Sequence, residues 1–153
     1  MHGALAIRRF RASDMDAVLK VEHASFRKDA YARNLFAYLY HKCGDLFLVA
    51  EGTGNICGYM VTCTRSRQGS RTAQLVSVAV SPAARRAGVA SALMDSTLRR
   101  LRRLRVRRLS LAVKVTNRAA LAFYRKYGFL QLRILRGYYE DGKDAWLMVR
   151  DIA

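Results

Sequence analysis

Hydrophobic positions alternate with polar ones in some stretches of this chain and recur every three or four residues in others. Short apolar stretches rich in β-branched residues, bounded by glycine, asparagine or charged residues, predict strands. The predicted strands are 4–10, 46–51, 56–65, 72–80, 109–114, 129–135 and 144–149. Between the second and third of these, Gly52-Thr53-Gly54-Asn55 is typical of a hairpin turn.

Helical spacing predicts four helices, at about 14–24, 29–41, 89–103 and 118–127. Ser13 is placed to cap the first helix, Asn117 is placed to cap the last, and Gly128 follows as a stop. Strands that first pair as hairpins and then alternate with helices predict an α/β fold. We expect a mixed, mostly antiparallel central sheet of about six to seven strands, with about four helices on both faces.

The chain has 153 residues, 52% of them hydrophobic, and a single proline, which predicts one globular domain over residues 1–153. No apolar stretch reaches the roughly 18 residues of a membrane span. The N-terminus carries its charges after a short apolar stretch, unlike a signal peptide. We therefore expect a cytoplasmic protein without a membrane partner.

Cysteine and histidine usage predicts no metal. Cys43, Cys57 and Cys63 lack the paired spacing of a zinc site, and the three histidines add no ligand pattern. We expect the three cysteines to be reduced, partly buried thiols.

The net charge of +17 limits the partners that the protein attracts. Seven of the ten residues in 99–108 are arginine. Such a field attracts anionic partners and accelerates their encounter in a salt-dependent way. Two interpretations stay open: the arginines form the solvated face of a helix packed through its leucines, or they contact an anionic partner such as rRNA or an acidic peptide.

The segment 78–94 carries the most specific chemistry. A β-branched strand ends after Val80, a proline follows, and a basic stretch with Gly88 leads into the helix predicted at 89–103. A strand, loop and helix in this order direct backbone N–H groups and the positive end of a helix dipole at one point, which suits a pyrophosphate. Gly88 fits a close approach of the backbone to a phosphate, where a Cβ would obstruct.

Arg85-Arg86-Ala87-Gly88-Val89-Ala90 resembles the pyrophosphate loop of the GNAT acetyltransferases, arginine/glutamine-x-x-glycine-x-glycine/alanine. About 30 residues further on, the chain is similar to the late GNAT signature Asn-x-x-Ala-x-x-x-Tyr-x-x-x-Gly-Phe. The matching positions are Asn117, Ala120, Tyr124, Gly128 and Phe129. The resemblance implies the GNAT fold, with a sheet splayed between its fourth and fifth strands, and acetyl-CoA as co-substrate.

The resemblance also assigns roles to residues. Backbone groups near Val78 and Val80 would pair with the pantetheine amides, and a backbone N–H there would stabilise the developing oxyanion. Tyr124 would protonate the leaving thiolate, an effect worth about 10²-fold. Asn117 would contact CoA, cap its helix, or do both. The implied acetyl-CoA residues are Val78, Ala79, Val80, Arg85, Arg86, Ala87, Gly88, Val89, Ala90, Ser91, Asn117 and Tyr124.

The stretch 136–148 is similar to the Tyr-Tyr hairpin of protein N-terminal acetyltransferases, which include the ribosomal-protein alanine N-acetyltransferases. In that branch the hairpin covers the substrate peptide, which implies that Tyr138 and Tyr139 bind it; ordinary hairpin aromatics are the alternative. The loop Lys28-Asp29-Ala30-Tyr31 resembles the acidic-x-Tyr loop of archaeal relatives, which adds Tyr31 to the substrate-binding residues.

The proton acceptor does not follow from the resemblance. Ala112 stands where related enzymes often have Glu or His, and Ala73 or Gln74 where some carry a tyrosine. The remaining catalytic candidates are Glu22 and Asp29, beside Glu140 and a water-mediated route. An α-amine with a pKa near 7.8 is roughly 10–15% neutral at pH 7, against about 0.04% for lysine, so a site without a strong base favours protein N-termini.

We therefore expect an acetyl-CoA-dependent Nα-acetyltransferase of the ribosomal-protein alanine type, acting by direct attack in a ternary complex, as a monomer or homodimer. One alternative is a GNAT enzyme that acts on small-molecule amines or lysine side chains. The other is a non-catalytic ribosome- or RNA-associated protein with a GNAT fold, which Ala112 and the arginine-rich helix favour.

Overall fold

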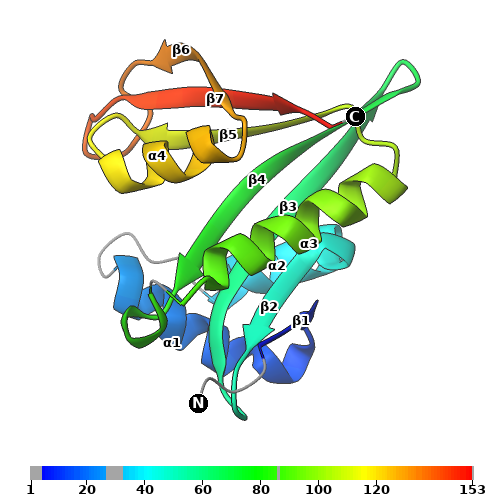
Figure 1. The fold of residues 1–153 in the computed structure, drawn as a ribbon, viewed down its shortest axis with the longest axis vertical. Coiled ribbons are helices and arrows are strands. Elements are labelled where there is room, and N and C mark those ends of the chain that lie inside the picture. Colours follow the sequence, from blue (N-terminus) through cyan, green and yellow to red (C-terminus); the bar gives the residue numbers. More distant parts are fainter. Residues whose placement is uncertain (1–4, 27–32, 86, 153) are drawn as a thin grey trace. The chain divides into compact units, whose positions relative to one another are not determined.

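The computed structural model describes residues 5–26, 33–85 and 87–152, which form seven strands and four α-helices (Figure 1). The strands are β1 (Ala6–Arg9), β2 (Phe47–Glu51), β3 (Ile56–Arg67), β4 (Ser70–Val80), β5 (Arg108–Lys114), β6 (Leu130–Leu135) and β7 (Ala145–Asp151). The helices are α1 (Met15–Phe26), α2 (Arg33–Cys43), α3 (Val89–Arg103) and α4 (Arg118–Lys126). Each predicted strand and helix is present; the predicted start of the second helix, 29–32, lies outside the described residues.

The sheet confirms the predicted α/β class. Its strand order is β1-β2-β3-β4-β5-β7-β6. The β4–β5 pair is parallel, over Thr72↔Arg108 to Gln74↔Ser110, and the pairs β1–β2, β2–β3, β5–β7 and β6–β7 are antiparallel. The chain divides into two compact units: unit 1 is Met1–Cys63 with Leu75–Leu104, and unit 2 is Thr64–Gln74 with Arg105–Ala153.

Unit 1 buries both faces of its strands, because successive side chains of a strand point to opposite faces. Phe47 and Tyr59 share one buried cluster with Phe36 of α2 and with residues of α1. Met60 faces the other way, where its Sδ accepts a hydrogen bond from Thr97 Oγ1 of α3 at 3.3 Å. Two helices therefore cover one face of these strands and α3 covers the other (Figure 1).

Unit 2 packs α4 on one face of β5, β7 and β6 (Figure 1). Arg150 of β7 donates from Nε to the Tyr127 carbonyl oxygen at the end of α4, at 2.6 Å. Arg125 of α4 donates from Nε to Gln131 Oε1 of β6 at 2.9 Å. Both bonds hold the C-terminal end of α4 to these strands.

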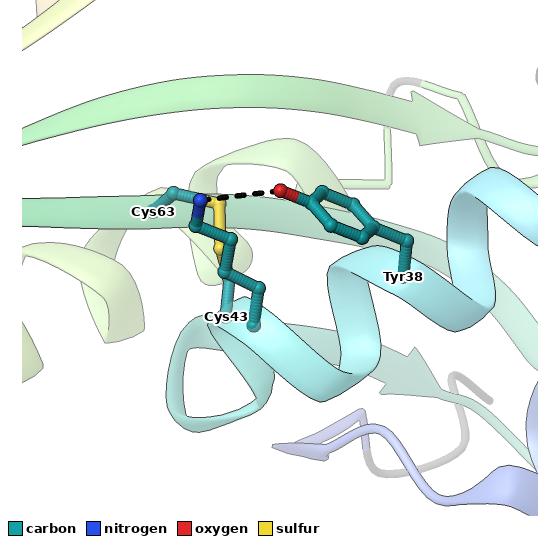
Figure 2. Close-up of a disulfide and its surroundings, with 4 residues drawn as sticks. Tyr38, Cys43 and Cys63 are labelled. Atoms are coloured by element: carbon teal, nitrogen blue, oxygen red, sulfur yellow. Dashed lines mark hydrogen bonds between the residues drawn. A yellow bond between two sulfur atoms is a disulfide. The ribbon is translucent and has the colours of Figure 1, made fainter.

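Cys43, the last residue of α2, forms a disulfide with Cys63 of β3, with the two Cα atoms 5.1 Å apart (Figure 2). The expectation of three reduced thiols is wrong for this pair, because the packing of α2 on β3 brings together two cysteines 20 residues apart. Cys57 is a free thiol, and burial raises its pKa. Beside the disulfide, the Tyr38 hydroxyl accepts a hydrogen bond from Lys42 Nζ at 3.1 Å (Figure 2).

Reduction of this disulfide is expected to lower the free energy of unfolding by about 3 kcal/mol, since the bond closes a loop of about 20 residues in the unfolded chain. Urea unfolding with and without dithiothreitol measures the difference. A Cys57→Ser protein, which keeps the disulfide and lacks the free thiol, should show the same loss. Equal stability of the oxidised and reduced proteins would contradict the prediction.

Candidate active site

The segment between β4 and α3 has the strand, turn and helix order that the sequence predicts. The Ser81 N–H donates to the Cys57 carbonyl oxygen at 2.8 Å, and a 3₁₀ turn at Pro82–Ala84 follows. At the start of α3 the Ala92 N–H donates to the Gly88 carbonyl oxygen at 3.0 Å. The first turn of an α-helix directs backbone N–H groups out of its N-terminus.

Gly88 precedes α3 with a φ of +77°, in the left-handed region that favours glycine. A Cβ at Gly88 would meet no atom within 4 Å, so the backbone borders open space. Arg85 and Ala87 of the same loop are exposed, whereas Arg86 lies outside the described residues. Open space, positive charge and a helix N-terminus together fit an anionic pyrophosphate group.

Sequence reasoning missed Gly58 of β3, on which the position of this loop depends. A Cβ at Gly58 would lie 2.9 Å from Val89 Cγ1 and 3.2 Å from the Ala79 carbonyl oxygen. Only a residue without a side chain allows the first turn of α3 to lie this close to β3. A glycine inside a predicted strand is the signal that marks such a close approach.

The end of β4 is held by α1. Ala79 is buried, and Val78 and Val80 are half-buried. Ser25 Oγ, near the end of α1, donates to the Val80 carbonyl oxygen at 3.3 Å. The strand end that the resemblance assigns to pantetheine is therefore fixed from within unit 1.

Glu22 of α1 is 1% exposed and belongs to a buried polar chain. The Tyr59 hydroxyl donates to Glu22 Oε1, and the same hydroxyl lies 2.7 Å from Ser77 Oγ of β4. A buried carboxylate is stabilised by such donors, which also connect it to β4. The structure thus places one sequence candidate for proton acceptance at the end of a three-residue hydrogen-bonded chain.

Asn117 caps α4 as the sequence predicts. Its Oδ1 accepts a hydrogen bond from the Ala120 N–H at 3.1 Å, which satisfies one donor of the first turn. The side chain is exposed at the start of the helix.

Tyr124 is 7% exposed, and its ring packs edge-on against Phe129 of the same unit, with centroids 5.6 Å apart. Burial, with a smaller contribution from Tyr139, raises the pKa of Tyr124 to about 12. The phenol therefore keeps its proton at neutral pH, the state that a proton donor requires.

The connection between β6 and β7 carries Tyr138 and Tyr139, whose rings lie at 81° to one another with centroids 5.0 Å apart. The Tyr139 N–H donates to the Lys143 carbonyl oxygen at 3.2 Å, and Lys114 Nζ lies 5.1 Å from the centroid of the Tyr139 ring. Tyr138 is 49% exposed. One tyrosine is thus anchored within unit 2 and the other presents its surface to solvent.

The strands β4 and β5 carry no carboxylate or histidine, since half-buried Ala112 and buried Ala73 stand where relatives have functional side chains. The candidate Glu140 is exposed. Asp29 and Tyr31 lie outside the described residues. In the part of the chain that the structure describes, no cluster of metal-ligating side chains is found, and no helix is long and apolar enough to cross a membrane.

The chain matches the model of the acetyltransferase (GNAT) family over residues 13–129. It is 29% identical over 157 residues to an N-alpha-acetyltransferase of Saccharolobus solfataricus, covering 95% of this chain and 92% of that protein. It is 31% identical over 148 residues to a putative [ribosomal protein bS18]-alanine N-acetyltransferase of Bacillus subtilis, covering 94% and 93% of the two. The crystal structure of Ard1 from Thermoplasma volcanium matches with a TM-score of 0.91 and 32% identity over 98% of this chain and 99% of that one.

Proposed function

Because the chain belongs to the acetyltransferase (GNAT) family, we propose that it transfers the acetyl group of acetyl-CoA to the α-amine of a protein N-terminus. The observation that carries this proposal is the similarity over nearly the whole chain to a protein named N-alpha-acetyltransferase. The finer form of the proposal is an N-terminal alanine of a ribosomal protein, which the similarity to the Bacillus subtilis protein supports.

In this proposal the loop before α3 holds the pyrophosphate of acetyl-CoA. Its donors are the backbone N–H groups of 88–90, and the guanidinium groups of Arg85 and Arg86 supply positive charge. The φ of +77° at Gly88 and the open space beside it support this role. Backbone groups of Val78 and Val80 bind the pantetheine amides, and a backbone N–H there donates to the thioester oxygen as it gains negative charge. The exposed Asn117 side chain contributes a further CoA contact.

The acetyl transfer itself forms one C–N bond and breaks one C–S bond. The neutral amine attacks the thioester carbon, the thiolate leaves, and Tyr124 donates its phenolic proton to the sulfur. With its pKa raised to about 12, Tyr124 holds this proton at every physiological pH before the transfer.

The amine must also lose a proton. We assign this proton to the hydrogen-bonded side chains of Ser77, Tyr59 and Glu22. The amine proton passes to the Ser77 hydroxyl, the Ser77 proton to the Tyr59 hydroxyl, and the Tyr59 proton to Glu22 Oε1. Asp29 is the other candidate. A Glu22→Gln variant that keeps its kcat would exclude the chain through Tyr59 and leave Asp29 or water.

The substrate peptide is held by Tyr138 and Tyr139, together with Tyr31. The half-exposed ring of Tyr138 supports this assignment, because it offers apolar area and a hydroxyl group to a peptide at low cost in side-chain entropy.

Thiol release from acetyl-CoA tests the proposal. Short peptides that begin with Ala, Ser, Met or Thr are compared with N-blocked peptides of the same sequence that contain a lysine. We expect turnover with the free N-termini alone, and the highest kcat/KM with alanine first. Turnover with the blocked peptides would show a lysine acetyltransferase instead, and turnover with none of the peptides would overturn the proposal.

A further inference from the structure

One end of unit 2 concentrates positive charge that acetyl transfer does not use. The segments Thr64–Gln74 and 105–108 hold six arginines and no carboxylate. They form the tip of the β3–β4 hairpin and the residues that lead into β5. At this end of the sheet, β4 and β5 pair in parallel. None of their residues is aromatic. An anion that binds here is therefore held by charge and hydrogen bonds, without stacking.

Hairpin geometry places the arginines of β3 on one face. The turn residues Gln68 and Gly69 have φ values of 51° and 77°, which is typical of a two-residue type I′ turn. In such a hairpin Arg67 lies opposite Ser70, and Arg65 lies opposite Thr72. Residues directly opposite one another on antiparallel strands project to the same face.

The register of the next strands extends this face. Thr72 of β4 pairs with Arg108 of β5, and Arg108 pairs with Asp151 of β7. Arg108 Nε lies 3.3 Å from Asp151 Oδ1, so this one carboxylate is matched by its own arginine. Arg65 and Arg67 are exposed, and among the described residues neither guanidinium has an ion-pair or hydrogen-bond partner. The face therefore keeps an excess of unmatched positive charge.

A cavity of about 500 Å³ opens on this face. Its lining residues are Ser70, Thr72, Arg107, Arg108, Asp151 and Ile152. Arg107 reaches across the cavity wall, where its Nη1 donates to Ser70 Oγ at 3.4 Å. Guanidinium groups beside hydroxyl groups are the donors that proteins commonly use on phosphate oxygens. We name the surface formed by Arg65, Arg67, Ser70, Thr72, Arg107 and Arg108 the hairpin face.

We propose that the hairpin face binds the phosphodiester backbone of a nucleic acid, independently of acetyl transfer. Arginine suits phosphate because its planar fork of donors matches two phosphate oxygens at once. The arginines of α3 differ, because they lie along one helix of unit 1 and none of them lines this cavity. The absence of aromatic residues makes the contact one with the backbone and not with the bases.

The test measures binding of an unstructured 12-nucleotide RNA by fluorescence anisotropy over a salt series. The first variant is the triple Arg65→Gln, Arg67→Gln, Arg107→Gln. Its matched control is the triple Arg99→Gln, Arg102→Gln, Arg103→Gln in α3, which lowers the net charge of +17 by the same three units. Both variants should retain the acetyl-CoA turnover and the unfolding transition of the wild-type protein, since none of these arginines belongs to the proposed active site.

We expect the hairpin-face variant to bind RNA roughly 100-fold more weakly at about 50 mM salt, and to lose about 2 from the slope of log K against log salt. The α3 control should lose less than about tenfold. DNA of the same sequence should give the same ranking of the variants by affinity, because it shares the phosphodiester backbone. Tighter binding of RNA or of DNA by the wild-type protein shows which nucleic acid the face prefers.

Three results would overturn the proposal. Equal losses in the two variants would mean that net charge alone is responsible. Binding of a poly-glutamate peptide as tightly as the RNA would assign the face to acidic protein segments. Anionic phospholipid vesicles that bind more tightly than the RNA, with the same dependence on Arg65, Arg67 and Arg107, would assign it to a membrane surface. A failure of acetyl transfer in the peptide assay leaves this result unaffected, so the two proposals fail separately.

Discussion

Replacement of Tyr124 by phenylalanine is expected to lower kcat about 100-fold and to leave the KM for acetyl-CoA within about twofold. The phenol is buried against Phe129, so the ring keeps its packing in the variant and only the proton donor is lost. A thiolate with a pKa near 8.5 leaves without full protonation, which limits the loss to about this size. Steady-state rates with an alanine-first peptide measure the effect.

The matched control is Tyr127→Phe, which removes a hydroxyl group one turn further along, at the C-terminal end of α4. It should keep kcat within about twofold, because Tyr127 has no part in the proposed transfer. An equal loss of kcat in both variants would assign the effect to the packing of α4 instead of to proton donation.

The pH dependence gives an independent check. A raised pKa keeps the phenol protonated below its value, so a Tyr124 pKa of about 12 leaves the donor intact through pH 10. The rate should rise through pH 8 as the peptide amine loses its proton, and then stay level to about pH 10. A decline in wild-type kcat with a midpoint near pH 9, absent from Tyr124→Phe, would contradict the raised pKa.

Replacement of Gly88 by valine is expected to weaken CoA binding about 100-fold. The new side chain enters the open space beside the loop, and a β-branched residue does not adopt a φ of +77° without strain. Loss of one or two charge-assisted hydrogen bonds to the pyrophosphate amounts to about 3 kcal/mol, which corresponds to that factor. Isothermal titration with CoA gives the dissociation constant directly.

Gly54 supplies the control, because its φ of +75° and its open surroundings match those of Gly88. Gly54→Val in the β2–β3 turn should cost similar stability and leave the affinity for CoA unchanged. If both variants bind CoA as tightly as the wild-type protein, the loop before α3 does not hold the pyrophosphate.

Much of the fold could be predicted because its signals are local. The helix 89–103 was predicted with the bounds that α3 has, since its apolar residues recur at the helical period and Gly88 marks its start. Asn117 was recognised as a cap from its position before an amphipathic stretch, and its Oδ1 makes that hydrogen bond. Both features depend on residues within about four positions of one another.

The disulfide and Gly58 depend on distant partners and were not predicted. Cys43 and Cys63 meet because a helix packs on a strand, and no spacing rule connects residues 20 apart. Gly58 carries no motif of its own, and its importance comes from Val89 Cγ1, which a Cβ would approach to 2.9 Å. Sequence patterns therefore identify the loop before α3 but do not single out Gly58, the strand residue that allows the position of this loop.

Glu22 shows the same division within the candidate active site. Its acidic side chain made it a candidate for proton acceptance, but its 1% exposure and its bond from Tyr59 come from the packing of α1 on β3. These contacts turn a possible surface carboxylate into the buried end of a hydrogen-bonded chain.

By itself, the sequence determined the elements, the order in which they occur and the residue types of the loop before α3, because periodicity, caps and glycines act over a few residues. Only the tertiary structure decided which cysteines pair, which carboxylate is buried and which arginines share the hairpin face. These outcomes depend on strand register and on side-chain packing between segments far apart in the chain, and a linear pattern does not contain either.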